Sequence, residues 1–207
     1  MHEQAAPAAS AVQRLHRRRA PEHFPQAVVK SRIQEITEKT RNIGIPLLII
    51  GGYAVMAHGY VRTTEDLDLI VPRERRADAD KLFRDLGMTV HNDAATFLQF
   101  NPRNESEMKV DVMFVSEEVF GQLERTSMET SLEGIHVRVV SLLHLIALKC
   151  HSFQNSNSIR RLKDLDDLIQ LILINQLDLN KPELRAIILK HGNAEIYEKL
   201  RHACSDQ

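Results

Sequence analysis

Apolar residues recur at helical spacing between residues 24 and 43, and this pattern predicts one amphipathic helix there. The apolar positions of that helix are Val28, Val29, Ile33 and Ile36. The run PLLII over residues 46–50 then predicts a buried strand, and the small residues that follow it suit a short helix packed closely on a sheet. A helix, a strand and a second helix are therefore expected in this order.

Alternation with a period of two replaces helical spacing in the middle of the chain. The segments DLDLIV, ATFLQF, EMKVDVMFV and IHVRVV each predict a strand, and an apolar stripe over residues 73–86 predicts a helix after the first of them. Beyond Ser141, which is placed to cap the next helix, the pattern turns helical. The helical segments are LLHLIALKCHSF, SIRRLKDLDDLIQLILI, a helix beginning near Pro182 and AEIYEKLRHA.

This order of elements predicts an α/β (α+β) protein with a small mixed sheet flanked by helices and a C-terminal helical region packed on it. We expect the sheet-containing core over residues 23–140 and the helical region over residues 141–207. Residues 1–22 combine Ala, Pro and a basic cluster with few large apolar side chains, so they are expected to form a disordered tail.

Composition and charge narrow the classes of partner. With 207 residues and 43% hydrophobic content, the chain can bury one ordinary core. Lys plus Arg number 27 against 28 Asp plus Glu, so overall charge favours neither nucleic acid nor a membrane. No apolar run approaches the length of a membrane span, the amino terminus does not resemble a signal peptide, and two unpaired cysteines suit a reducing compartment. We expect a cytoplasmic protein without membrane contacts.

Two glycines directly follow the PLLII strand. Exposed amides of Gly51 and Gly52 at a strand-to-helix step would offer donors to phosphate oxygens. The alternative is a tight turn that needs glycine for its backbone geometry.

Three aspartates fall on predicted strands. The period of two places Asp66 and Asp68 on one face of their strand, and Asp111 shares a face with Lys109 on a later strand. A solvated strand face is the simpler interpretation of Asp66 and Asp68 alone. Three carboxylates on neighbouring strands would repel one another unless a cation neutralised them, and they could hold two divalent ions about 3.5 to 4 Å apart for displacement at phosphorus.

These residues resemble the active-site signature of the nucleotidyltransferase superfamily related to DNA polymerase beta. The resemblance rests on Gly51-Gly52, the segment HGYVRTTEDLDLIV and the segment KVDVMFV. It implies that Asp66 and Asp68 hold two Mg²⁺ (or Mn²⁺) ions, that Asp111 holds the catalytic ion and helps deprotonate the acceptor, and that the glycines bind the β and γ phosphates. The second glycine departs from the commoner Gly-Ser form, which leaves only backbone amides at that position.

Later segments resemble the abortive-infection (AbiEii-like) branch of this superfamily, which includes toxins of toxin–antitoxin pairs. These segments are VVSLLHLIALKCHSF, with Lys149, and RRLKDLDDL, with Asp164. The resemblance implies that Lys149 offsets charge on the leaving pyrophosphate and that Asp164 orients Lys149 or the acceptor. A snorkelling lysine and a charge-laced helix face, with Asp164 paired to its basic neighbours, are the structural alternatives. Arg62 could reach a phosphate or pair with Glu65.

The resulting hypothesis is a metal-dependent enzyme that moves a nucleoside monophosphate from an NTP to an acceptor hydroxyl. RNA, tRNA or a protein side chain is expected as acceptor, with an antitoxin or regulator as partner if the chain is a toxin. A small-molecule (antibiotic-type) nucleotidyltransferase and a non-catalytic nucleotide-binding module are the alternatives. A track for RNA ends could be formed by the basic tail together with Arg73, Arg75, Arg76, Arg160, Arg161 and Lys163.

Overall fold

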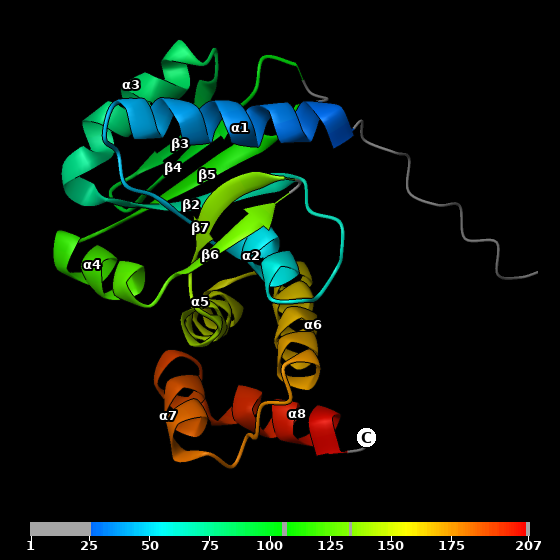
Figure 1. Cartoon of the computed structure of the whole chain (residues 1–207). Coiled ribbons are helices and arrows are strands. Elements are labelled where there is room, and N and C mark those ends of the chain that lie inside the picture. Colours follow the sequence, from blue (N-terminus) through cyan, green and yellow to red (C-terminus); the bar gives the residue numbers. More distant parts are fainter. Residues whose placement is uncertain (1–25, 105–106, 133, 206–207) are drawn as a thin grey trace, which may run out of the picture.

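The protein is built around one mixed β-sheet with helices on both of its faces. The computed structural model describes residues 26–104, 107–132 and 134–205, so the tail expected over residues 1–22 lies outside the described residues. Figure 1 shows α1 and α3 on one side of the sheet, and α2, α5 and α6 on the other. The helices α7 and α8 extend this second side away from the sheet.

The sheet has seven strands in the order β3-β4-β5-β2-β1-β7-β6. Strands β2 and β5, and strands β1 and β7, pair in parallel, whereas the other neighbours are antiparallel. The mixed sheet predicted from the sequence is therefore confirmed, although it is larger than expected. The strands are β1 (Leu48–Ile49), β2 (Asp66–Pro72), β3 (Thr89–Ala94), β4 (Phe97–Asn101), β5 (Lys109–Val115), β6 (Met128–Leu132) and β7 (Ile135–Val139).

The helices fall into a group around the sheet and a group near the C-terminus. The first comprises α1 (Gln26–Asn42), α2 (Gly51–Ala57), α3 (Arg76–Asp85) and α4 (Glu117–Arg125), with a 3-10 turn over Arg73–Arg75. The second comprises α5 (Leu142–Asn155), α6 (Ser158–Ile174), α7 (Pro182–His191) and α8 (Ala194–Ser205). None of the helices in the described part of the chain is long and apolar enough to cross a bilayer.

Side-chain caps fix where the two helices nearest the site begin. Ser141 Oγ accepts a hydrogen bond from the His144 amide at the start of α5, and Asn157 Oδ1 accepts one from the Arg160 amide at the start of α6. Each bond satisfies a backbone donor that has no partner within its helix. The caps thereby set the position of Arg160 in the first turn of α6.

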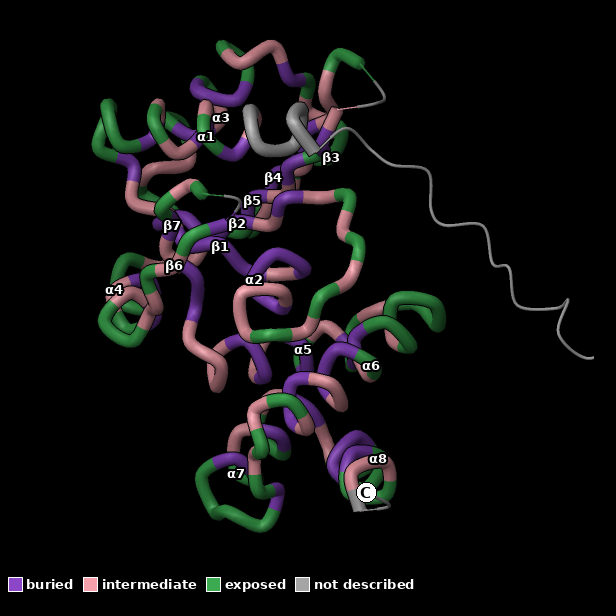
Figure 2. The backbone as a smooth tube through the Cα atoms, turned by 45° about the vertical axis from the view of Figure 1, so that its right-hand side comes forward, coloured by how far each residue is buried: buried purple, intermediate pink, exposed green. Residues whose placement is uncertain are grey.

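Two groups of apolar side chains are buried, and α5 contributes to both. Leu145 of α5 and Leu171 of α6 belong to the main core beneath the sheet. Ile146 and Phe153 of α5 belong instead to a second core shared with α6, α7 and α8. Figure 2 shows that buried positions run continuously from the sheet into these helices. The C-terminal region therefore packs on the sheet through α5 and α6, and a boundary at residue 140 remains a prediction.

Candidate active site

The three predicted aspartates lie on one face of two neighbouring strands. Asp68 of β2 is directly opposite Asp111 of β5 in the parallel pairing, and Asp66 is opposite Lys109. Residues two apart on a strand share a face, so Asp66 lies on the same side as Asp68 and Asp111. Asp111 accepts a hydrogen bond from Gln99 Nε2 at 2.9 Å. The sheet register thus brings these carboxylates together across 45 positions of sequence.

The electrostatic state of the carboxylates bears on their use as metal ligands. Burial raises the pKa of Asp68 to about 6, and the nearby charge of Asp111 adds to this effect. Burial also raises the pKa of Asp111, although the hydrogen bond from Gln99 opposes it. Across the described residues, no three acidic, His or Cys side chains converge tightly enough to form a preformed metal site. As a donor set, the three carboxylates suit a hard divalent cation, which would relieve their repulsion.

Gly51 permits the first turn of α2 to lie directly on Asp68. Gly51 has a φ of 61°, a conformation that favours glycine. A Cβ atom at this position would stand 1.8 Å from Asp68 Oδ2 and 2.7 Å from Asp68 Cβ. Because Asp68 Cβ is also within 3 Å, turning the carboxylate would not remove the clash, and any other residue at this position would require α2 or β2 to shift.

Gly52 is required for a different reason. A Cβ atom there would stand 2.3 Å from Thr64 Oγ1 and 3.2 Å from an Arg62 guanidinium nitrogen. The Thr64 side chain thus fills the space that a serine at position 52 would need. This packing accounts for Gly-Gly in place of the commoner Gly-Ser and leaves a hydroxyl beside the glycines.

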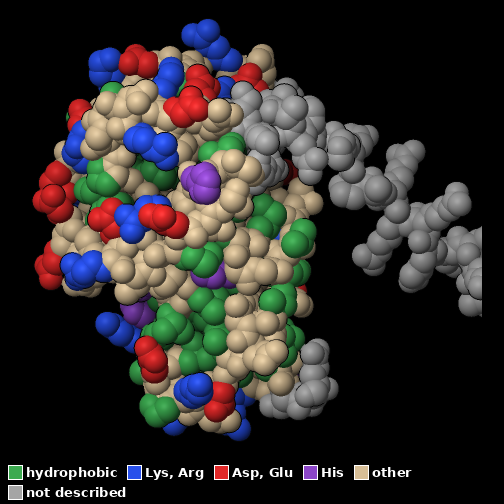
Figure 3. Space-filling model, viewed as in Figure 1, with side chains coloured by type: hydrophobic (Ala, Val, Ile, Leu, Met, Phe, Trp, Pro, Cys, Tyr) green, Lys and Arg blue, Asp and Glu red, His purple; other side chains and the backbone are tan. Residues whose placement is uncertain are grey.

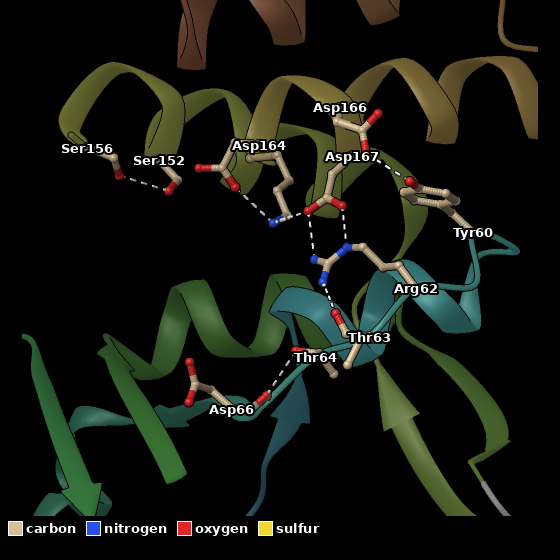
Figure 4. A network of polar contacts seen from close by, with 11 residues as sticks. Tyr60, Arg62, Thr63, Thr64, Asp66, Ser152, Ser156, Asp164, Asp166 and Asp167 are labelled. Atoms are coloured by element: carbon tan, nitrogen blue, oxygen red, sulfur yellow. Dashed lines mark hydrogen bonds and ion pairs between the residues drawn. The ribbon is translucent and has the colours of Figure 1, made fainter. Parts of the chain in front are cut away.

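A buried ion-pair network, shown in Figure 4, joins the loop before β2 to α5 and α6. Lys149 Nζ lies 2.8 Å from Asp164 Oδ1 and 2.6 Å from Asp167 Oδ2. Arg62 donates two hydrogen bonds to Asp167, at 2.6 and 2.8 Å. Burial alone would raise the pKa of Asp167, but the bonds from Arg62 and Lys149 outweigh burial and hold this pKa below its usual value. We call Arg62, Lys149, Asp164 and Asp167 the buried network.

The buried network revises three interpretations of the sequence. Arg62 pairs with Asp167 rather than with Glu65. The Lys149 side chain is only 10% exposed and bonds to two carboxylates, so it does not snorkel. Asp164 is buried and pairs with Lys149 instead of lying on a solvated, charge-laced helix face. One oxygen of Asp164, Oδ2, is buried without a hydrogen-bond partner in the described structure.

A cavity of about 600 Å³ lies against the aspartates, between the sheet and α5. Its lining includes Gly51, Asp68 and Asp111 at the catalytic end, and Lys149 and Asp164 from the buried network. Of the other predicted site residues, Gly52, Asp66 and Arg62 lie outside the described lining. Its volume is typical of a small-molecule site.

Sequence reasoning missed Gln99 and assigned Arg160 to an RNA track instead of to this site. Gln99 reaches Asp111 because β4 and β5 place these residues opposite each other. Arg160 lines the cavity and forms no ion pair with a described residue. Its positive charge opposes the rise in the pKa of Asp68 and of Asp111 without cancelling it. The alternation of ATFLQF could have identified Gln99, whereas Arg160 was hidden among neighbouring basic residues.

The basic track expected for RNA is not continuous. Arg73, Arg75 and Arg76 follow the far end of β2 from Asp66, whereas Arg160 and Arg161 lie on α6. Arg75 pairs with Asp78, and Arg76 pairs with Asp93. Figure 3 shows acidic and basic side chains interspersed over the part of the molecule that carries α1 and α3. The grouping of these residues was therefore wrong.

The mixed sheet, with Asp68 and Asp111 paired on adjacent strands, is the arrangement that the resemblance to nucleotidyltransferases implies. A family model described as uncharacterised nucleotidyltransferase matches residues 1–206, and the chain belongs to this family. A search of curated proteins finds no match.

Solved structures show the same fold. The chain is similar to the solution structure of the antibiotic-resistance factor ANT(2'')-Ia, at 19% identity and a TM-score of 0.61 over 89% of this chain and 100% of that chain. It is similar to an antigenic nucleotidyltransferase-like protein from Paracoccidioides brasiliensis, at 19% identity and a TM-score of 0.54 over 87% and 94% of the two chains. The lincosamide antibiotic adenylyltransferase LnuA matches at 13% identity and a TM-score of 0.52 over 70% and 98%.

Replacing Gly51 with Ala should destabilise the protein more than the same change at Gly44. Gly44 also has a positive φ, of 65°, but a Cβ there would meet nothing within 4 Å, so it isolates the backbone cost. That cost is about 1–2 kcal/mol, and overpacking against Asp68 adds about 1–3 kcal/mol at Gly51. Urea unfolding of the two variants measures the difference. Equal losses would show that α2 does not press on Asp68.

The Asp68→Asn variant should be more stable than the wild type at alkaline pH in EDTA. A folded-state pKa near 6, above the ordinary value of 3.8, means that the stability from Asp68 is full below 3.8 and is lost as the pH rises through 6. The variant escapes this loss, so its advantage should grow from near zero at pH 4 to about 2–3 kcal/mol at pH 8. Unfolding at several pH values, with exposed Asp85→Asn as control, tests this. A pH-independent difference would contradict it.

The Asp167→Asn variant should be strongly destabilised, and the neighbouring Asp166→Asn variant should not. Asp167 is fully buried and neutralises Arg62 and Lys149, so its loss leaves buried positive charge at a cost of about 3–5 kcal/mol. Asp166 is exposed and bonds to Tyr60, and its loss should cost about 1 kcal/mol or less. Denaturant unfolding compares them. Similar small losses of stability in the two variants would show that Asp167 does not stabilise the buried network.

Proposed function

We propose that the protein transfers a nucleoside monophosphate from an NTP to an acceptor hydroxyl, with Mg²⁺ or Mn²⁺ as cofactor. The observation that carries the proposal is the pairing of Asp68 with Asp111 on one sheet face, with Asp66 on the same side and the cavity beside them. The raised pKa values of Asp68 and Asp111 argue against a non-catalytic module, because two carboxylates buried side by side destabilise a domain that does not use them.

The proposed reaction is a displacement at the α phosphorus. The acceptor oxygen forms a bond to this phosphorus, the bond to the bridging oxygen of the β phosphate breaks, and pyrophosphate leaves. Asp111 would accept the proton of the acceptor hydroxyl, and Gln99 fixes its carboxylate. Asp66, Asp68 and Asp111 would bind the metal ions, which supply positive charge to the transferring phosphoryl group.

Other residues would bind the nucleotide. The amides of Gly51 and Gly52 would contact the outer phosphates, with the Arg62 guanidinium held beside Gly52 by Asp167. Arg160 and Lys149 line the cavity as cations and would offset charge on the leaving pyrophosphate. The unpaired Oδ2 of Asp164 would accept a hydrogen bond from a nucleotide hydroxyl or amino group.

The finer proposal, a toxin of the abortive-infection type, draws on one contact. Lys149 and Asp164 come from the two segments that resemble that branch, and their side chains lie 2.8 Å apart. As such a toxin, the protein would modify RNA, tRNA or a protein side chain and be restrained by an antitoxin. The names of ANT(2'')-Ia and LnuA as antibiotic-modifying proteins favour a small-molecule acceptor instead.

Incubation with each α-labelled NTP, Mg²⁺ and cell extract should yield a labelled product. The Asp66→Asn plus Asp68→Asn variant should reduce labelling by at least about 100-fold, because it removes charge that the reaction needs. Asp85→Asn, an exposed change on α3, is the matched control and should label at the wild-type rate. Metal-dependent NTP binding is measured on the same proteins. A folded wild type that neither binds nor transfers any NTP would refute the proposed function.

A further inference from the structure

The sheet face that carries the acids continues as an apolar surface. On β5, Met113 and Val115 follow Asp111 at intervals of two, so they share its face. On β4, Phe97 is opposite Met113 just as Gln99 is opposite Asp111. An acceptor that presents its hydroxyl to Asp111 therefore has apolar side chains beside it on two strands.

Helix α5 supplies the opposite wall of this part of the cavity. Leu145, Leu148 and Ser152 line the cavity at intervals of three and four residues, which places them on one helix face. Met113 remains 36% exposed, although it lines a cavity inside the site. We call the space between Phe97, Met113, Val115 and Leu148 the apolar slot.

The charges around the cavity match neither a polycation nor a nucleic acid. The described acids in its lining are Asp68 and Asp111, which serve the reaction, and Asp164, which Lys149 already neutralises. A polycationic acceptor would find no further carboxylate among the described lining residues. Arg160 is the one described lining Lys or Arg without an ion pair, whereas a nucleic acid needs cations along several phosphates.

We propose that the acceptor is a small, uncharged amphipathic alcohol whose apolar body lies in the apolar slot while its hydroxyl reaches Asp111. This proposal rests on the proposed function. The alcohol oxygen becomes bonded to the α phosphorus, its proton passes to Asp111, and pyrophosphate leaves. Burial of the apolar body in the apolar slot contributes to affinity through the hydrophobic effect. The proposal thus gives the acceptor β4, β5 and Leu148 of α5, and it leaves the glycines, Arg160 and Lys149 to the nucleotide.

Two fluorescent probes that differ by one sulfonate test the slot. N-Phenyl-1-naphthylamine is uncharged, and 8-anilinonaphthalene-1-sulfonate is its anionic counterpart. With Mg²⁺ and a non-hydrolysable ATP analogue, the uncharged probe should bind the full chain at one site. Met113→Glu should raise its dissociation constant at least tenfold, whereas Val119→Glu should not. Val119 is the matched control, because it is 41% exposed and lies on α4 outside the lining of this cavity. Tobramycin and an oligoribonucleotide should not displace the probe.

The label-transfer assay supplies the second readout, after products are separated into RNA, protein and small molecules, and the small molecules are resolved by charge and by reversed-phase retention. Label should appear in a small-molecule phosphodiester that a reversed-phase column retains more strongly than the free nucleoside monophosphate, and Met113→Glu should abolish it while leaving metal-dependent NTP binding intact. Label in RNA, in protein or on a polycation would overturn the acceptor class and uphold nucleotidyl transfer. Equal probe affinity in Met113→Glu and Val119→Glu, or tighter binding of the sulfonate, would also overturn it. If the wild type itself does not bind any NTP in the presence of the metal ion, the proposed function is refuted instead.

Discussion

The parallel pairing of β2 with β5 is the constraint on which the site depends. It holds Asp68 in a buried position opposite Asp111, and the raised pKa of Asp68, caused first by burial and then by the charge of Asp111, puts the cost of ionising this carboxylate at about 3 kcal/mol. The opposite face of the same strands offsets this cost. Leu67, Leu69, Val110 and Val112 are fully buried there, and burying each contributes about 1.5–3 kcal/mol. The alternation that places acids on one face thus also provides the apolar face that holds them together.

The approach of α2 to these strands depends on small residues and on the buried network together. Gly51 lets the backbone contact Asp68, and Gly52 leaves room for Thr64 in the loop that leads into β2. That loop is held from its other side by Arg62, which binds Asp167 of α6. Because two buried cations face two buried carboxylates, the network has no net charge and avoids the full cost of isolated buried ions. The C-terminal helices therefore position the loop before the acids as well as covering the sheet.

Much of this arrangement could be predicted because it depends on local periodicity. A period of two was enough to place Asp66 and Asp68 on one face and Asp111 on another strand, and the seven-stranded sheet brings these strands together. Strands β3 and β6 could not be predicted as readily, because TVHNDA is largely polar and exposed and METSL is mostly polar with one buried residue. The partner of Arg62 lies 105 positions away, and no local pattern identifies it. Gln99 similarly acquires its role only through the β4–β5 register.

The cavity divides between elements that the sequence separates widely. Backbone amides and the buried network come from α2, its following loop, α5 and α6, and they carry the groups suited to phosphates. The remaining wall comes from β4, β5 and α5, where the lining includes the uncharged, apolar side chains of Met113 and Leu148. The acids lie at the junction of these two surfaces, where in the proposed reaction a phosphorus atom held on one side would meet an oxygen presented from the other. Because the apolar slot contains none of the groups proposed to bind phosphates, a change in it should alter the acceptor more than the nucleotide.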